Sequence, residues 1–188
     1  SSCGPTADGR IKPDIMASGD NVDVSYLADN NVTDADCPAA SSVDGTSFSS
    51  PIVAGYSLLV REYFTKGYYP SGSRSGSPAI TPSGALIKAV LLNGARNMSG
   101  TGVLNDAPNF NQGWGRMMLD DGLYFNGDTR RLQVWDVPVG EGPATGETWE
   151  RQIAAGAGQM LKFTLTWYDP QGELAAGVEL VNDLALEI

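Results

Sequence analysis

Residues 41–55, SSVDGTSFSSPIVAG, place hydroxyl side chains around a glycine and a proline, directly before an apolar run. A serine hydroxyl acts as a nucleophile where it is held still, exposed and close to donors that can stabilise an oxyanion. Ser47 fits this requirement, because it follows Gly45 and Thr46 at the expected foot of a helix, where free N–H groups face the reacting centre. The alternative is that Ser47 only caps this helix.

A serine nucleophile needs a base, and the chain contains no histidine. Asp8, Asp14 and Asp44 are near in sequence, but a carboxylate with a pKa of about 4 is a poor base for a hydroxyl at neutral pH. Lys12 would serve only if it were buried with a lowered pKa, whereas the surrounding GRIKPD is typical of an exposed turn. We therefore expect the base to lie outside these 188 residues.

The composition limits the class of partner. Hydrophobic residues make up 41% of the chain and charged residues 18%, which is typical of a globular protein. The formal net charge of -10 would repel phosphate backbones and anionic lipids. No apolar run approaches the roughly 20 residues that a membrane span needs. We therefore expect neither nucleic acid nor a membrane as a partner.

The two cysteines, Cys3 and Cys37, both lie in the first, loop-rich segment. A disulfide between them would contribute roughly 3 to 4 kcal/mol on the chain-entropy account. Two buried thiols without a role are the equally weighted alternative.

The elements that position Ser47 follow from the pattern around it. Residues 1–46 are rich in turn formers, with strand-like patches at 15–17 and 22–27. Dense apolar residues from Phe48 predict a buried helix over 48–66 that Gly67 ends, with Pro51 in its first turn.

A second helix is expected over residues 82–97, with Thr81 as the N-cap and Pro82 at the first helical position. Beyond Asn126, clusters of β-formers between turn signals predict strands. We place a domain boundary there, with one domain over 1–126 and the start of a β domain over 130–188. Three or four strands do not close a sandwich, so this second domain is expected to be incomplete.

Three stretches carry a resemblance to a known family. GTSFSSPIVAG resembles the nucleophile motif of the subtilisin-like serine proteases, SSCGPTADGRIKPDIMASG is similar to the segment that precedes it, and NQGWGRMMLDDGL resembles the closing segment. Together they cover residues 1 to about 125 in family order. The following LTWYD and LVNDLALEI look most like the bacterial alkaline subtilases that carry a C-terminal β-barrel or jelly-roll domain.

The resemblance implies an α/β catalytic domain with a parallel sheet, present in part, followed by an incomplete antiparallel β-sandwich. It implies a secreted, extracellular serine endopeptidase that acts on protein or peptide substrates. Ser47 would attack the scissile carbonyl and supply one oxyanion donor from its own N–H, and Thr46 would support the site. The order of the triad is Asp, His, Ser, so the aspartate, the histidine and the oxyanion asparagine should lie upstream of Ser1. The chain needs that N-terminal part as a partner and is expected to be inactive alone.

Two other functions compete with this interpretation. A serine-carboxyl peptidase of the sedolisin type also has a Gly-Thr-Ser motif followed by proline, and it would fit the absent histidine, but PIVAG is closer to the subtilisin pattern. A pseudoprotease or binding fragment without catalysis is the second alternative.

No cofactor is required for the chemistry. Structural calcium is a further expectation, and Asp169 and Asp183, in WYDP and LVND, are its candidate ligands.

Overall fold

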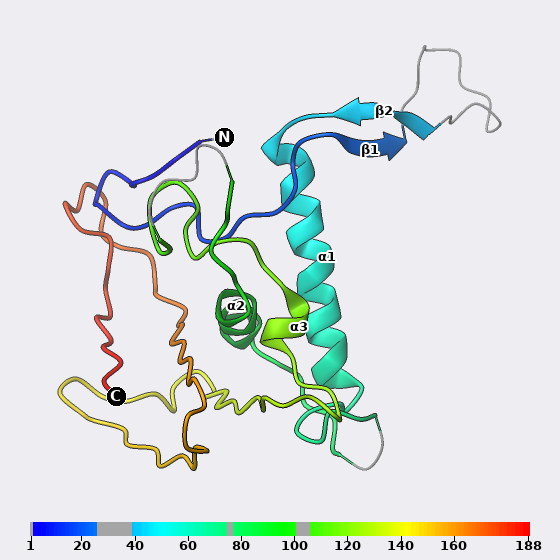
Figure 1. Cartoon of the computed structure of the whole chain (residues 1–188). Coiled ribbons are helices and arrows are strands. Elements are labelled where there is room, and N and C mark those ends of the chain that lie inside the picture. Colours follow the sequence, from blue (N-terminus) through cyan, green and yellow to red (C-terminus); the bar gives the residue numbers. More distant parts are fainter. Residues whose placement is uncertain (1, 26–38, 75–76, 101–105) are drawn as a thin grey trace. The chain divides into compact units, whose positions relative to one another are not determined.

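The computed structural model describes residues 2–25, 39–74, 77–100 and 106–188 (Figure 1). Contacts divide the chain into two compact units, the first formed by Ser1–Leu58 and Arg96–Met117 and the second by Leu59–Ala95 and Met118–Ile188. The elements are β1 (Val22–Ser25), β2 (Ala39–Val43), α1 (Thr46–Thr65), α2 (Gly84–Asn93) and α3 (Leu119–Gly122).

The predicted helix at residues 48–66 is confirmed as α1, which begins two residues earlier. It ends as expected at Gly67, whose φ of 72° belongs to the left-handed region. The N–H of Tyr68 donates to Tyr63 O at 3.0 Å and the N–H of Gly67 to Phe64 O at 3.1 Å, which is the Schellman arrangement. Because α1 starts at Thr46, Pro51 is its sixth residue rather than part of its first turn.

The second predicted helix is correct in place but wrong in its bounds. The N-cap of α2 is Ser83 rather than Thr81, and its hydroxyl accepts a hydrogen bond from Leu86 N at 3.0 Å. Asp136 holds this cap, since its carboxylate accepts from Ser83 N at 2.7 Å and from Ser83 Oγ at 2.6 Å. Asp136 lies 53 residues away along the chain, so the sequence near Ser83 gives no signal for this contact.

The core of the second unit lies along α2 and the last part of α1. One face of α2 is buried, and it meets α3 at a close approach, where an added Cβ at Gly94 would lie 2.7 Å from Gly122 N. The buried apolar side chains of this unit are Val60, Tyr63, Phe64, Leu86, Val90, Leu91, Leu92, Ala95, Leu123 and Tyr124.

Within the described residues, the expected parallel sheet is represented by a single parallel bridge. In the described part of the chain, β1 and β2 pair antiparallel, with Val22 opposite Val43. Met16, in the predicted patch 15–17, forms an isolated parallel bridge with Arg116, and Arg116 forms an antiparallel bridge with Arg96. Three extended segments therefore lie side by side in the first unit without becoming named strands.

The predicted antiparallel β-sandwich over 130–188 is not confirmed. Residues 127–188 are all described and contain no strand, and their main-chain hydrogen bonds close only local turns. Alternation is nevertheless visible, because Leu132, Val134 and Asp136 are half-buried whereas the residues between them are exposed. The two compact units are defined by contacts between residues and do not test where a domain begins. The predicted domain boundary at 126–130 therefore stays a prediction.

Candidate active site around Ser47

Ser47 is the second residue of α1, and both it and Thr46 are exposed. In the part of the chain that the structure describes, its hydroxyl has no hydrogen-bond partner. The first N–H groups of a helix lack main-chain acceptors within it, so this end of α1 can present donors to an oxyanion. Pro51 has no N–H, so the carbonyl of Ser47 also lacks the usual helical donor four residues later.

The strand β2 leads into α1 through only two residues, Asp44 and Gly45. The N–H of Gly45 donates to Gly19 O at 2.7 Å, and Gly45 O accepts from Phe48 N at 3.1 Å. Asp44 Oδ1 accepts from Asn21 N at 2.9 Å. Gly45 has a φ of 151°, which an L side chain rarely adopts. The connection into the first turn is therefore fixed on both sides of Gly45.

The other serines nearby are placed differently from Ser47. Ser49 is half-buried, and its Oγ occupies the space next to Gly19. Ser50 is exposed, like Ser47. Exposure therefore distinguishes Ser47 from Ser49 but not from Ser50. Only the sequence motif distinguishes Ser47 from Ser50 as the candidate nucleophile.

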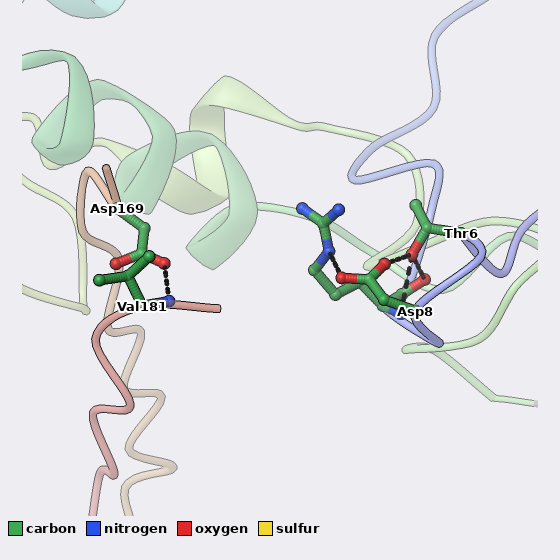
Figure 2. Close-up of polar contacts among 5 residues, drawn as sticks. Thr6, Asp8, Asp169 and Val181 are labelled. Atoms are coloured by element: carbon green, nitrogen blue, oxygen red, sulfur yellow. Dashed lines mark hydrogen bonds and ion pairs between the residues drawn. The ribbon is translucent and has the colours of Figure 1, made fainter. Parts of the chain in front are cut away.

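The ionisable groups that could replace a histidine already have partners. Asp8 accepts from Thr6 Oγ1 at 2.6 Å and from Arg10 Nε at 2.7 Å (Figure 2). Lys12 donates to Asp14 and remains half exposed. That the proton acceptor for Ser47 lies outside the chain stays a prediction.

The calcium candidate Asp169 is bound by main-chain donors (Figure 2). Its carboxylate accepts from Val181 N at 2.7 Å and from the main-chain N and side-chain Nδ2 of Asn182 at 2.8 Å each. The bond from Val181 is the largest cause that holds the pKa of Asp169 below its usual range. Within the described residues no three acidic, histidine or cysteine side chains gather as metal ligands. Calcium at Asp169 and Asp183 stays a prediction.

The cysteine pair and a membrane span are the remaining features that the sequence raised. Cys3 is exposed, but Cys37 lies outside the described residues, so their pairing stays a prediction. Within the described ranges, none of the helices has the length and apolar character of a membrane-spanning segment.

Sequence reasoning missed Gly19 and Asp44 as residues that hold the approach to Ser47. Gly19 matters through contacts with Gly45 and Ser49, which lie far along the chain. The only signal in the sequence was a glycine in the ASG segment that resembles the family pattern. A glycine at the end of a strand-like patch can serve a turn, a bulge or a close approach, so the sequence alone does not assign it this contact.

Comparison with known proteins gives a consistent picture. A family model described as the subtilase family matches residues 1–115. The chain is 30% identical to the serine protease/ABC transporter B family protein tagD of Dictyostelium discoideum over 99% of its own length, which is 13% of that relative. It is 30% identical to tagA of the same organism over all of its length, which is 11% of that relative.

The C5a peptidase of Streptococcus pyogenes is 37% identical over 50% of the chain, which is 7% of that relative. The chain thus spans 13% or less of the length of each of these proteins.

Proposed function

The chain belongs to the subtilase family, and on this premise we propose that it supplies the nucleophile of a serine endopeptidase. The observation that carries the proposal is the exposed Ser47 at the N-terminal end of α1, within the Gly-Thr-Ser motif. Neighbouring donors and an accessible hydroxyl are what acyl transfer requires.

The proposed reaction begins when Ser47 Oγ attacks the carbonyl carbon of a peptide bond. The hydroxyl proton passes to a base outside this chain, since the chain has no histidine. The N–H of Ser47 stabilises the oxyanion, and Thr46 supports the turn. The base then protonates the leaving amine, an acyl-enzyme forms on Ser47, and water releases the acid product.

An exposed face of α1 supports the proposal that further parts of the catalytic domain pack here. Pro51, Ala54, Gly55, Leu58 and Leu59 recur at helical spacing, and all five are exposed. Leu58 is 67% exposed. A continuous apolar face of this kind favours association when it is left uncovered. The 188 residues alone should therefore associate and cleave no peptide.

The same proposal includes protein or peptide substrates, an extracellular location and a C-terminal β domain that begins near residue 130. The alternation of half-buried and exposed residues at 132–137 supports the last part.

The test uses the intact peptidase that contains this chain. Ser47→Ala should lower kcat by about 10⁶, the size of the loss when the nucleophile of subtilisin is removed. An active-site phosphonate should label Ser47, and the matched control Ser50→Ala should keep its label and activity. Labelling at Ser50, or unchanged cleavage by Ser47→Ala, would show that the assignment is wrong. A pH optimum of about 4 rather than above 7 would favour the serine-carboxyl alternative.

A further inference from the structure

Gly19 lies beside the first turn of α1 and contacts it in two ways. Its carbonyl accepts a hydrogen bond from Gly45 N at 2.7 Å. A Cβ added at Gly19 would overlap Ser49 Oγ and would come within 2.9 Å of Gly45 O. Gly19 does not have a positive φ, so space rather than backbone conformation requires a glycine here.

Both contacts act on residues that flank Ser47. Gly45 precedes Ser47 by two residues and Ser49 follows it by two, so Gly19 touches the turn on each side of the nucleophile. Gly45 O also accepts from Phe48 N at 3.1 Å, within the same turn. Ser49 could rotate away from a new methyl group, but Gly45 O belongs to the main chain and could move only with the turn.

We propose that Gly19 is a positioning residue for Ser47. Its carbonyl binds the first turn of α1 and its lack of a side chain lets this turn approach closely, and together they fix the orientation of the Ser47 hydroxyl. This inference rests on the proposed function of Ser47. Gly19 does not touch the substrate. Its effect on the reaction arises because a displacement of a reacting group by about 1 Å can cost on the order of 10²-fold in rate.

The test compares Gly19→Ala, Ser49→Ala and the double variant in the intact peptidase. Gly19→Ala should lower kcat and the rate of phosphonate labelling at Ser47 by on the order of 10²-fold, with little change in KM. Ser49→Ala should stay active, and in the Gly19→Ala background it should leave most of the loss in kcat in place, because the overlap with the main-chain Gly45 O remains. Gly142→Ala is the control, since nothing lies within 4 Å of a Cβ at Gly142.

Several outcomes would overturn the inference: Gly19→Ala as active as the control, a loss confined to KM, or a double variant as active as Ser49→Ala, which would assign the loss to the Ser49 side chain and not to the turn. If Gly19→Ala does not fold, the double variant decides, because a folded double variant with the same kcat as Ser49→Ala also overturns it. The failure of the proposed function is seen separately, as unchanged cleavage by Ser47→Ala.

Discussion

The approach to Ser47 and the C-terminal residues 127–188 are held in place by different kinds of hydrogen bond. In the first unit, main-chain bonds join distant segments, as between Gly45 and Gly19 or between Met16 and Gly115. In residues 127–188 the main-chain bonds close local turns. There, side chains make the distant connections, such as that of Asp136 to Ser83.

The segment 162–168 shows how the side-chain connections work. Lys162 Nζ donates to Ala95 O at 2.9 Å, and Thr166 Oγ1 donates to Ala85 O at 2.7 Å. Asn93 Nδ2 donates to Thr164 Oγ1 at 2.9 Å. Every second residue from Lys162 to Thr166 thus bonds to α2 or to Ala95, the residue after its C-cap. Burial lowers the pKa of Lys162.

This difference predicts different sensitivities in the two regions. Main-chain pairing depends on backbone angles and on space, so it is vulnerable where a glycine is replaced. Side-chain pairing depends on a few polar groups, so single polar substitutions can loosen a segment.

The largest effect is expected from Gly115→Ala. Gly115 O accepts from Met16 N at 2.9 Å, and an added Cβ would overlap Arg96 O. With the strain of a φ of 104°, the substitution should lower the free energy of unfolding by about 3 kcal/mol or more. A urea unfolding midpoint of the intact protein measures this loss.

Gly127→Ala is the matched control for Gly115→Ala. Its φ of 107° gives the same backbone strain, but nothing lies within 4 Å of its Cβ. It should cost about 1 kcal/mol. Equal losses in the two variants would show that close packing of main chains does not distinguish the surroundings of Gly115 from residues 127–188.

Tyr63 should make the second unit sensitive to alkaline pH. Its hydroxyl donates to Tyr124 O at 2.6 Å, and burial raises its pKa to about 12. The unfolded chain has a value of about 10, so the folded state binds this proton more tightly. The resulting stability, about 2 to 3 kcal/mol, is complete below pH 10 and is lost as the pH rises toward 12.

Tyr63→Phe should remove this pH dependence and destabilise the protein at pH 8 by about 1 to 2 kcal/mol, because Tyr124 O loses its donor. Unfolding midpoints at about pH 8 and about pH 11 measure both effects. Tyr168→Phe, at an 80% exposed tyrosine, should change neither. A Tyr63→Phe protein with the parent's slope between about pH 10 and pH 12 would contradict this explanation.

The same contrast accounts for what could be predicted from sequence. The apolar density of α1 and its end at Gly67 are local signals, and the structure agrees with them. The contact of the Ser83 cap with Asp136 joins residues that are remote in sequence, so it could not be predicted. Alternation at 162–166 predicts a strand, but those side chains bind α2 and its end instead. Alternation identifies an extended segment with two different faces, and it does not say whether a strand or a helix lies beside it.

A smaller effect is expected from Asp136→Asn. The substitution removes a negative charge at the N-terminal end of α2 and one of the two acceptors for Ser83. The cost should be about 1 kcal/mol. Faster amide exchange in the first turn of α2 would measure it, with the exposed Glu150→Gln as the control for charge. Unchanged exchange would mean that Asp136 does not attach its segment to α2.

The smallest and most local effect is expected at Asp169, where the attachment is closest to solvent. The donors at Val181 and Asn182 lower the pKa of this carboxylate, so its contribution is present above the unfolded value of about 4 and is lost as the pH falls through the lower folded value. At about pH 6, Asp169→Asn should therefore speed the amide exchange of Val181 and Asn182 and leave α2 unchanged. Asp183→Asn is the matched control, because only a calcium ion shared by the two carboxylates would make both variants lose the same protection. If Asp169 alone protects these amides, their protection should also persist when a calcium chelator is added. If a calcium chelator or Asp183→Asn speeds the exchange of these amides, a calcium ion and not the Asp169 carboxylate alone protects them.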